Sequence, residues 1–195
     1  MQMKLIECGG AGLCGWLSVD YWLEQLPQLE MYDSKAELTR EIQNGMLETH
    51  IVLTIVREIL DKPKYYCNPN IFPIKEDAAF TWVLHHPLDQ SNAAPAFTDS
   101  SLLVYRREVV AHFDTAHLRQ WMCHQVLNKS VWFDEVWCLA LNHLSSMQLN
   151  DTGLVLLTMF NGKVMAQQFA TRASNIFIMN CSNTHWVAVD FVRGG

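Results

Sequence analysis

The sequence predicts an α+β fold in which helices come first and an antiparallel sheet comes last. Apolar residues recur at helical spacing in the first third of the chain, an Asn-Gly dipeptide separates two β-prone runs near residue 161, and two more β-prone runs follow. No linker rich in Gly, Pro or Ser divides the sequence. We therefore expect one domain over residues 1–195, with a helical sub-lobe at about 1–150 and a β sub-lobe at about 151–195.

Three helices are predicted in the first third of the chain. The first begins at Cys14, carries apolar residues at helical spacing and stops before Pro27. The second covers about residues 34–46 and opens with the capping-box pattern Ser34-x-x-Glu37. The third covers about residues 48–60 and has an apolar stripe formed by Val52, Ile55, Val56 and Ile59.

The middle of the chain carries weaker local signals. A short helix is predicted at about residues 77–84, and residues 86–100 are rich in Pro, Asn, Asp and Ser, which is typical of a long connection. Residues 102–110 suit a strand. Helices are expected at about residues 115–127 and 131–149.

The last part of the chain predicts four strands. Residues 154–160 and 163–170 flank Asn161-Gly162, the two-residue signal for a type I′ hairpin. Residues 175–181 and 185–192 are β-prone as well. An antiparallel sheet is the expected result.

Composition narrows the class of partner. The net charge is -6 and the basic residues are scattered, which argues against a nucleic-acid surface. No apolar run approaches the roughly 20 residues that span a bilayer, and no signal peptide is visible. The six cysteines form no CxxC pair, and the histidines and cysteines show no metal-binding spacing. We expect an intracellular monomer with reduced thiols, no metal and no cofactor.

Two segments far apart in the sequence carry the candidate chemistry. A glycine-rich loop precedes Cys14 at a helix N-terminus, where the helix dipole favours a thiolate. Gly9, Gly10 and Leu13 are expected to form a substrate-binding loop with backbone amides for an oxyanion. His185 opens a late apolar strand and is the expected general base for the Cys14 nucleophile.

The Cys14-Gly15-Trp16 segment after a glycine loop, with His185-Trp186 opening a late strand, resembles the papain-like proteases of nidoviruses. The resemblance is strongest to the ovarian-tumour-type deubiquitinating protease of arteriviruses, and it covers about ten residues at each end of the chain. It implies a helical lobe that carries Cys14 and a sheet that carries His185. It also implies that Trp16 and Trp186 are aromatic residues of the cleft.

The same resemblance implies a function. It predicts cleavage of peptide or isopeptide bonds after Gly-Gly in a viral polyprotein, within the host cell cytoplasm. Ubiquitin and its interferon-induced relative are the expected additional substrates.

The residue that orients His185 stays open at this point. Ovarian-tumour-type enzymes often have an acidic residue three positions before the cysteine or two after the histidine, and Ala11 and Val187 stand there. Asp190 and Asn183 are the two candidates, although strand alternation places Asp190 on the face opposite His185. A Cys-His pair without a third member is also possible.

Two other classes of function compete with the protease. One is a bacterial effector peptidase, deamidase or acyltransferase, which would use the same nucleophile and a different acceptor. The other is a non-catalytic interaction module in which Cys14 is a core residue.

Overall fold

The computed structural model describes residues 1–10, 12–26, 33–60, 115–127, 132–182 and 185–194. They belong to two compact units. The first contains Met1–Leu38 and Trp132–Gly195, and the second contains Thr39–Val131. Helices combine with a five-stranded sheet, so the predicted α+β class is confirmed. The helix predicted at 77–84, the connection at 86–100 and the strand at 102–110 lie outside the described residues.

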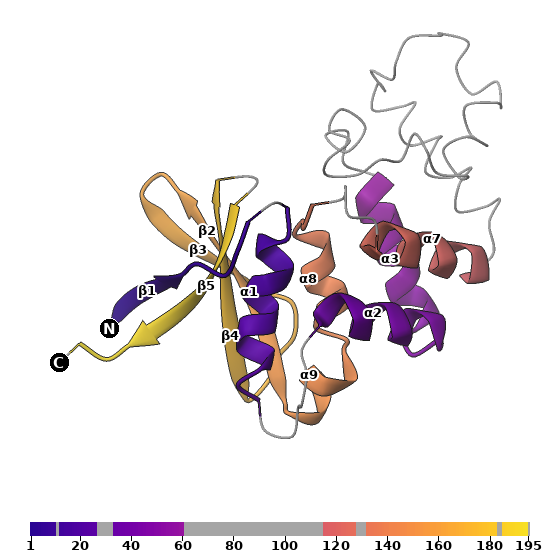
Figure 1. The fold of residues 1–195 in the computed structure, drawn as a ribbon, viewed down its shortest axis with the longest axis horizontal. Coiled ribbons are helices and arrows are strands. Elements are labelled where there is room, and N and C mark those ends of the chain that lie inside the picture. Colours follow the sequence, from indigo (N-terminus) through magenta and orange to yellow (C-terminus); the bar gives the residue numbers. More distant parts are fainter. Residues whose placement is uncertain (11, 27–32, 61–114, 128–131, 183–184, 195) are drawn as a thin grey trace, which may run out of the picture. The chain divides into compact units, whose positions relative to one another are not determined.

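A mixed sheet forms the centre of the first unit (Figure 1). Its strand order is β1-β5-β4-β2-β3, and all neighbours are antiparallel except β2 and β4, which are parallel. The prediction of an antiparallel sheet was wrong at this pair. The strands are β1 Gln2–Ile6, β2 Thr152–Phe160, β3 Lys163–Gln168, β4 Ser174–Ser182 and β5 His185–Val192.

The predicted hairpin is present between β2 and β3. Asn161 and Gly162 have φ values of 49° and 73°, and Phe160 pairs with Lys163 across the turn. Positive φ at both central residues is the requirement of a type I′ turn. The hairpin prediction is therefore confirmed.

The parallel pair arises because the chain returns from β3 past the start of β2. The Ser174 N–H donates to the Asp151 carbonyl oxygen at 3.1 Å, which fixes the start of β4 beside the start of β2. A Cβ atom on Gly153 would lie 3.0 Å from Asn175 Oδ1 and 3.1 Å from Arg172 Cγ. The small residue at position 153 lets the returning segment cross closely.

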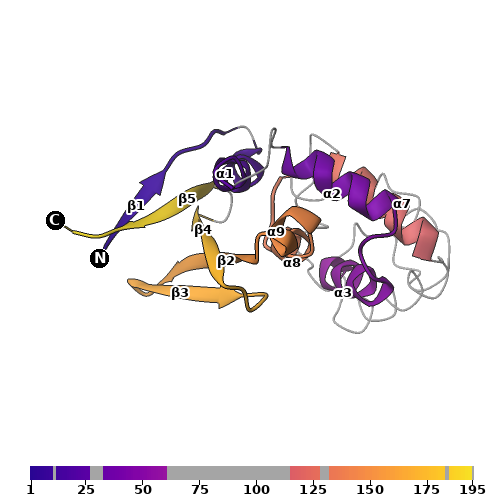
Figure 2. The ribbon, with the colours of Figure 1, turned by 90° about the horizontal axis from the view of Figure 1, so that it is seen from below.

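Helices cover one face of the sheet (Figure 2). They are α1 Cys14–Leu23, α8 Val136–Leu141 and α9 Ser145–Leu149. The Trp186 ring on β5 lies 4.9 Å from the Phe133 ring, which lies 5.0 Å from the Trp16 ring on α1. Aromatic edge-to-face packing therefore joins the sheet to its first helix.

The helix predicted over residues 131–149 is two short helices, α8 and α9. Between them, the buried Asn142 side chain donates to the Cys138 carbonyl oxygen and accepts from the Leu154 N–H at 2.8 Å. Leu144 has a ψ of 138°, which is extended rather than helical. A side chain bonded to strand β2 therefore interrupts the continuous helix that the apolar pattern predicts.

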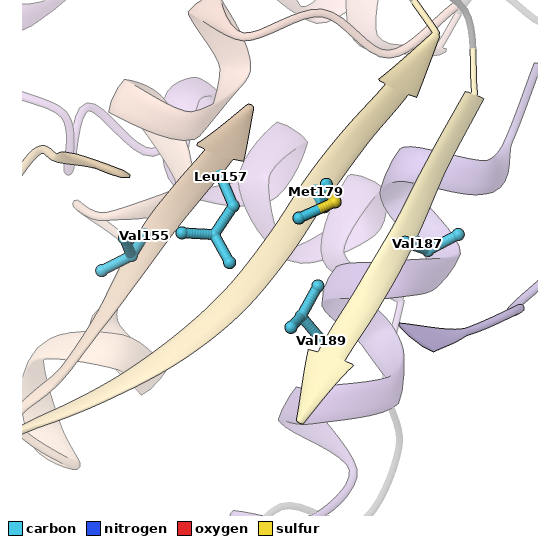
Figure 3. Packing of buried hydrophobic residues seen from close by; sticks show 5 residues of the cluster. All are labelled: Val155, Leu157, Met179, Val187 and Val189. Atoms are coloured by element: carbon cyan, nitrogen blue, oxygen red, sulfur yellow. The ribbon is translucent and has the colours of Figure 1, made fainter. Parts of the chain in front are cut away.

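The other face of the sheet carries aliphatic side chains from three neighbouring strands (Figure 3). The register pairs Leu157 with Met179 and Met179 with Val187, and it pairs Phe177 with both Val155 and Val189. The sheet is thus apolar on both faces. The buried cluster consists of Val155, Leu157, Met179, Val187 and Val189.

Helix α2, Ser34–Gln43, begins differently from the predicted capping box. Asp33 Oδ1 accepts the Ala36 N–H at 3.0 Å, so Asp33 is the capping residue. The Glu37 carboxylate accepts instead from the Ser146 hydroxyl and N–H, at 3.0 and 3.3 Å. The capping-box prediction was wrong because Glu37 anchors α9.

A carboxylate of α1 also binds the start of α2. Asp20 Oδ1 accepts the Ser34 N–H at 2.9 Å. Burial raises the pKa of Asp20 to about 6, although the hydrogen bonds from Ser34 act in the opposite direction. Desolvation therefore outweighs hydrogen bonding at this carboxylate.

The second unit contains the end of α2 and two helices, α3 Thr49–Leu60 and α7 Thr115–Leu127, which pack together. Helix α2 stops at Gln43 because Gly45 has a φ of 70° and the Met46 N–H donates to the Glu41 carbonyl oxygen. The predicted bounds of α7 are confirmed. The buried side chains include Val52, Ile55 and Val56 of α3 and Leu118, Met122 and Val126 of α7.

Candidate active site

One end of the sheet in the first unit gathers several polar side chains. The register brings together the last residue of β1, the first residue of β5 and the last residues of β4, because β5 is antiparallel to both neighbours. His185 pairs with Ser182 there. Strand β5 begins at this end of the sheet, so any reaction of His185 takes place there.

Cys14 lies level with this end. Helix α1 packs against β5 and β4 (Figure 1), and Trp22 Nε1 donates to the Phe177 carbonyl oxygen at 2.9 Å. Cys14 is eight helical residues from Trp22, a rise of about 12 Å. Cys181 is four strand residues from Phe177, a rise of about 13 Å. The two lengths match, so the start of α1 stands beside the end of β4.

Electrostatics gives the same placement. Burial raises the pKa of the Cys181 thiol, and the charges of Glu7 and Cys14 raise it further. Both groups must therefore be close enough to Cys181 for their charges to act on it. Glu7, Cys14, Cys181 and His185 therefore lie at the same end of the sheet, and we call them the sheet-end cluster. Alternation along β5 directs His185 to the face opposite the one that carries Trp186 and α1.

Glu7 and Cys181 are the members that the sequence did not predict, and Glu7 contacts His185. His185 Nε2 lies 2.8 Å from Glu7 Oε2, across 178 residues of chain. Glu7 directly follows β1, a strand in a part of the chain where only helices were predicted. The pairing of β1 with β5 creates this contact, and no local sequence pattern predicts it.

The two residues proposed from the sequence to orient His185 are placed elsewhere or are not described. Asp190 pairs with Lys4 in the register, five residues along β5 from His185. Five strand residues correspond to about 16 Å, which is beyond the reach of the imidazole. Asn183 lies outside the described residues. Glu7 is the carboxylate that contacts His185 in the structure.

Cys14 is the first residue of α1 and is only 3% exposed. Leu13 precedes it as the N-cap residue and provides no side-chain cap. The first N–H groups of an α-helix have no intrahelical acceptor, and they point towards the N-terminus. These are the groups available to a negatively charged oxygen formed at Cys14.

The glycines around Cys14 have packing roles. A Cβ atom on Gly15 would lie 2.2 Å from Phe133 Cγ, and one on Gly12 would lie 2.2 Å from Trp132 Cδ1. Both positions therefore accept no side chain. Gly9 and Gly10 are exposed, and the Gly10 carbonyl oxygen accepts the Leu13 N–H at 3.2 Å. An oxyanion role for Gly9, Gly10 and Leu13 stays a prediction.

Trp16 and Trp186 belong to the core. Each is only 2% exposed, and both rings pack against Phe133. The sequence predicted that both rings line a cleft. That prediction was wrong, because neither buried ring can line an open cleft. Their apolar bulk holds α1 against β5.

Comparisons of the chain with protein-family models, with curated proteins and with solved structures find no match. The described residues contain no group of three or more His, Cys, Asp and Glu side chains placed to bind a metal ion. In the same part of the chain, no helix has the length and apolar character needed to cross a bilayer.

The sheet-end cluster combines the parts of a nucleophilic site. A thiol stands at a helix N-terminus, a histidine opens the neighbouring strand, and a carboxylate binds one nitrogen of that histidine. With Nε2 bonded to Glu7, Nδ1 is the nitrogen that is left to exchange a proton with a thiol. Such an arrangement is suited to acyl transfer.

Proposed function

We propose that the protein is a cysteine hydrolase of the papain-like type, with Cys14 as nucleophile, His185 as general base and Glu7 as the residue that orients His185. The observation that carries the proposal is the 2.8 Å contact between His185 and Glu7 at the end of the sheet where α1 begins. A buried nucleophile, a base and an orienting carboxylate are the three roles that such a reaction needs.

The reaction has two halves. The Cys14 sulfur attacks the carbonyl carbon of the scissile amide after His185 takes the thiol proton, and N–H groups at the start of α1 stabilise the oxyanion. His185 then protonates the leaving amine, and a thioester stays on Cys14. In the second half, His185 takes a proton from water, hydroxide attacks the thioester, and the released Cys14 sulfur recovers its proton.

The substrate that we propose is a peptide or isopeptide bond after Gly-Gly, in a viral polyprotein or in ubiquitin-like modifiers. The resemblance of the Cys14 and His185 segments to nidovirus proteases supports it. The proposed location is the host cell cytoplasm.

A non-catalytic module is the competing proposal, and two observations favour it. Cys14 is almost fully buried, and the packing against Trp132 and Phe133 accounts for Gly12 and Gly15 without reference to a substrate. A structural cysteine in a tight turn would show the same features. The reactivity of the thiol separates the two proposals.

Competitive alkylation at neutral pH is the deciding experiment. The native protein is treated with limiting iodoacetamide, and labelling of each cysteine is followed by mass spectrometry. We expect Cys14 to react about tenfold faster than Cys181, which is exposed but has a raised pKa. A His185→Ala variant should lose this advantage at Cys14 and keep the labelling rate of Cys181. Faster labelling of Cys181 than of Cys14 would contradict the proposal.

A further inference from the structure

Strand β3 forms one edge of the five-stranded sheet (Figure 2). All of its residues, Lys163–Gln168, are exposed, and within the described part of the chain β3 pairs only with β2. The open side of an edge strand presents N–H and C=O groups that have no partner in the sheet. Strand β3 is therefore able to pair with a further strand.

The hairpin determines which main-chain groups of β3 lie on its open side. Phe160 and Lys163 flank the type I′ turn and form its hydrogen-bonded pair, in which the Lys163 N–H is directed to β2. Hydrogen-bonded and non-hydrogen-bonded pairs alternate along an antiparallel ladder. The residues whose main-chain groups point away from β2 are therefore Val164, Ala166 and Gln168.

The two edges of the sheet differ in their protection against pairing. Proteins commonly protect an exposed edge with a charged side chain, a proline or a bulge. Strand β1, the opposite edge, carries Lys4 at its centre. In β3 the only charged residue is Lys163, at the end next to the turn, and the strand has no proline and an unbroken register with β2. Strand β3 is thus the unprotected edge.

An apolar row of side chains runs across the sheet and ends at this edge. The register joins one residue from each of four neighbouring strands, namely Val187, Met179, Leu157 and Ala166. The first three are buried, whereas Ala166 is exposed at the open edge. The row lacks a neighbour only at Ala166, and a partner strand with a small apolar residue at that position would continue it.

We propose that β3 pairs antiparallel with β3 of a second copy of this chain, with the Ala166 residues of the two copies opposite each other on a twofold axis. In this register Val164 of each copy faces Gln168 of the other, so every outward main-chain group is bonded. The two Lys163 side chains lie at opposite ends of the interface, so no like charges meet. The assembly is a dimer in place of the monomer expected from the sequence.

A second copy fits this edge better than an unrelated peptide does. Sheet edges that bind extended peptides combine main-chain hydrogen bonds with pockets for alternate side chains. The side chains of β3 are all exposed, so this strand provides the main-chain bonds without enclosing a side chain of a partner. An identical strand needs no pocket, because it continues the apolar row at Ala166.

Sedimentation velocity of the full chain over a range of concentrations tests the pairing. We expect the wild type to dimerise with a Kd in the micromolar range, as suits a small interface. Ala166→Lys places two ammonium groups opposite each other on the axis and should raise this Kd by about tenfold or more. Ala166→Glu should do the same with two carboxylates. Because Ala166 is exposed, both variants should fold, and circular dichroism verifies this.

A mixture and a control variant make the test specific. Ala166→Lys mixed with Ala166→Glu brings opposite charges together, so the mixture should form a dimer with a Kd close to that of the wild type. Gln167→Lys adds the same charge one residue further along β3, where the proposed register places it opposite the uncharged Met165 of the other copy. It should change the Kd by no more than about twofold.

Three results would overturn the proposal. A wild type that stays monomeric at the highest soluble concentration would show that β3 does not pair with itself. Equal weakening by Ala166→Lys and Gln167→Lys would mean that the dimer depends on net charge or on another surface. A mixture of the two Ala166 variants that stays monomeric would show that these residues are not opposite each other.

Discussion

His185 and Trp186 are adjacent on β5, yet they meet opposite surroundings. The Trp186 side chain is buried among aromatic rings on the helix-covered face, whereas His185 is half-exposed and bound to the exposed Glu7 carboxylate. Trp186 stabilises the fold, and the His185 imidazole is a potential proton acceptor at the end of the sheet. Side chains alternate between the two faces along a strand, so these adjacent residues have different roles. Variants of Trp186 should change the free energy of unfolding, and variants that disturb His185 should change the rate of the proposed reaction.

Trp186→Ala should have the largest effect on stability. Deleting a buried indole removes its packing against Phe133 and leaves a cavity, so we expect a loss of about 3–5 kcal/mol in the free energy of unfolding. Urea unfolding followed by circular dichroism measures it.

Trp186→Phe is the matched control. Among the described residues, no acceptor lies within hydrogen-bonding distance of Trp186 Nε1. Phenylalanine keeps an aromatic ring and removes this unbonded donor, so it should cost clearly less than alanine. Equal losses for the two variants would mean that the aromatic contact with Phe133 contributes little.

Asp20→Asn should have an intermediate effect that depends on pH. The pKa of Asp20 is about 6 in the folded protein and 3.8 in a free carboxyl group, so the unfolded chain ionises first as the pH rises. In the wild type, the folded state is stabilised by protonated Asp20 below about pH 4, and this contribution to the free energy of unfolding is lost as the pH rises through 6. Asparagine keeps the acceptor for the Ser34 N–H and cannot ionise. The variant should therefore gain on the order of 2 kcal/mol over the wild type at pH 7.

Thermal unfolding of both proteins from pH 4 to pH 7.5 tests this difference. The advantage of Asp20→Asn should be small at pH 4 and should grow up to about pH 7. A constant advantage at all pH values would show that the ionisation of Asp20 is not its cause.

Glu7→Gln should have the smallest effect on stability and a clear effect on catalysis. Exposed ion pairs contribute little, so we expect the free energy of unfolding to change by less than about 0.5 kcal/mol. Glutamine cannot stabilise a protonated His185 as a carboxylate does, so kcat should fall by about tenfold or more. Hydrolysis of C-terminal fluorogenic amides measures kcat, and urea unfolding measures the free energy of unfolding.

The chain offers a matched control for this variant. Glu48 also pairs with a histidine, His50, at 3.1 Å, and both side chains are exposed. Glu48→Gln should leave kcat unchanged. A similar fall in both variants would assign the effect to net charge rather than to the orientation of His185.

Local signals in the sequence were sufficient for the late strands and for the start of α1. Asn161-Gly162 specified the hairpin because a type I′ turn depends on two adjacent residues, and His185 was placed correctly at the start of β5. The sheet-end cluster could be predicted only in part. Cys14 and His185 stand out within their own segments, but Glu7 becomes relevant only after β1 pairs with β5.

Other differences have the same kind of cause. The break between α8 and α9 depends on Asn142 bonding to β2, and the start of α2 depends on Glu37 bonding to α9 instead of capping its own helix. Both helix boundaries depend on a side chain that forms a hydrogen bond with an element distant in the sequence. Periodicity and capping patterns describe only the neighbours in sequence, so they cannot contain this information.

The pairing of β1 with β5 has a consequence for biosynthesis. Glu7 emerges from the ribosome early and His185 emerges 178 residues later, so these two residues meet only after nearly all of the first unit has been made. In the proposed mechanism, a nascent chain that stops before β5 has the thiol of Cys14 but no base to activate it. We expect such chains to be inert towards neighbouring proteins, so that reactivity begins only when synthesis has passed the last strand.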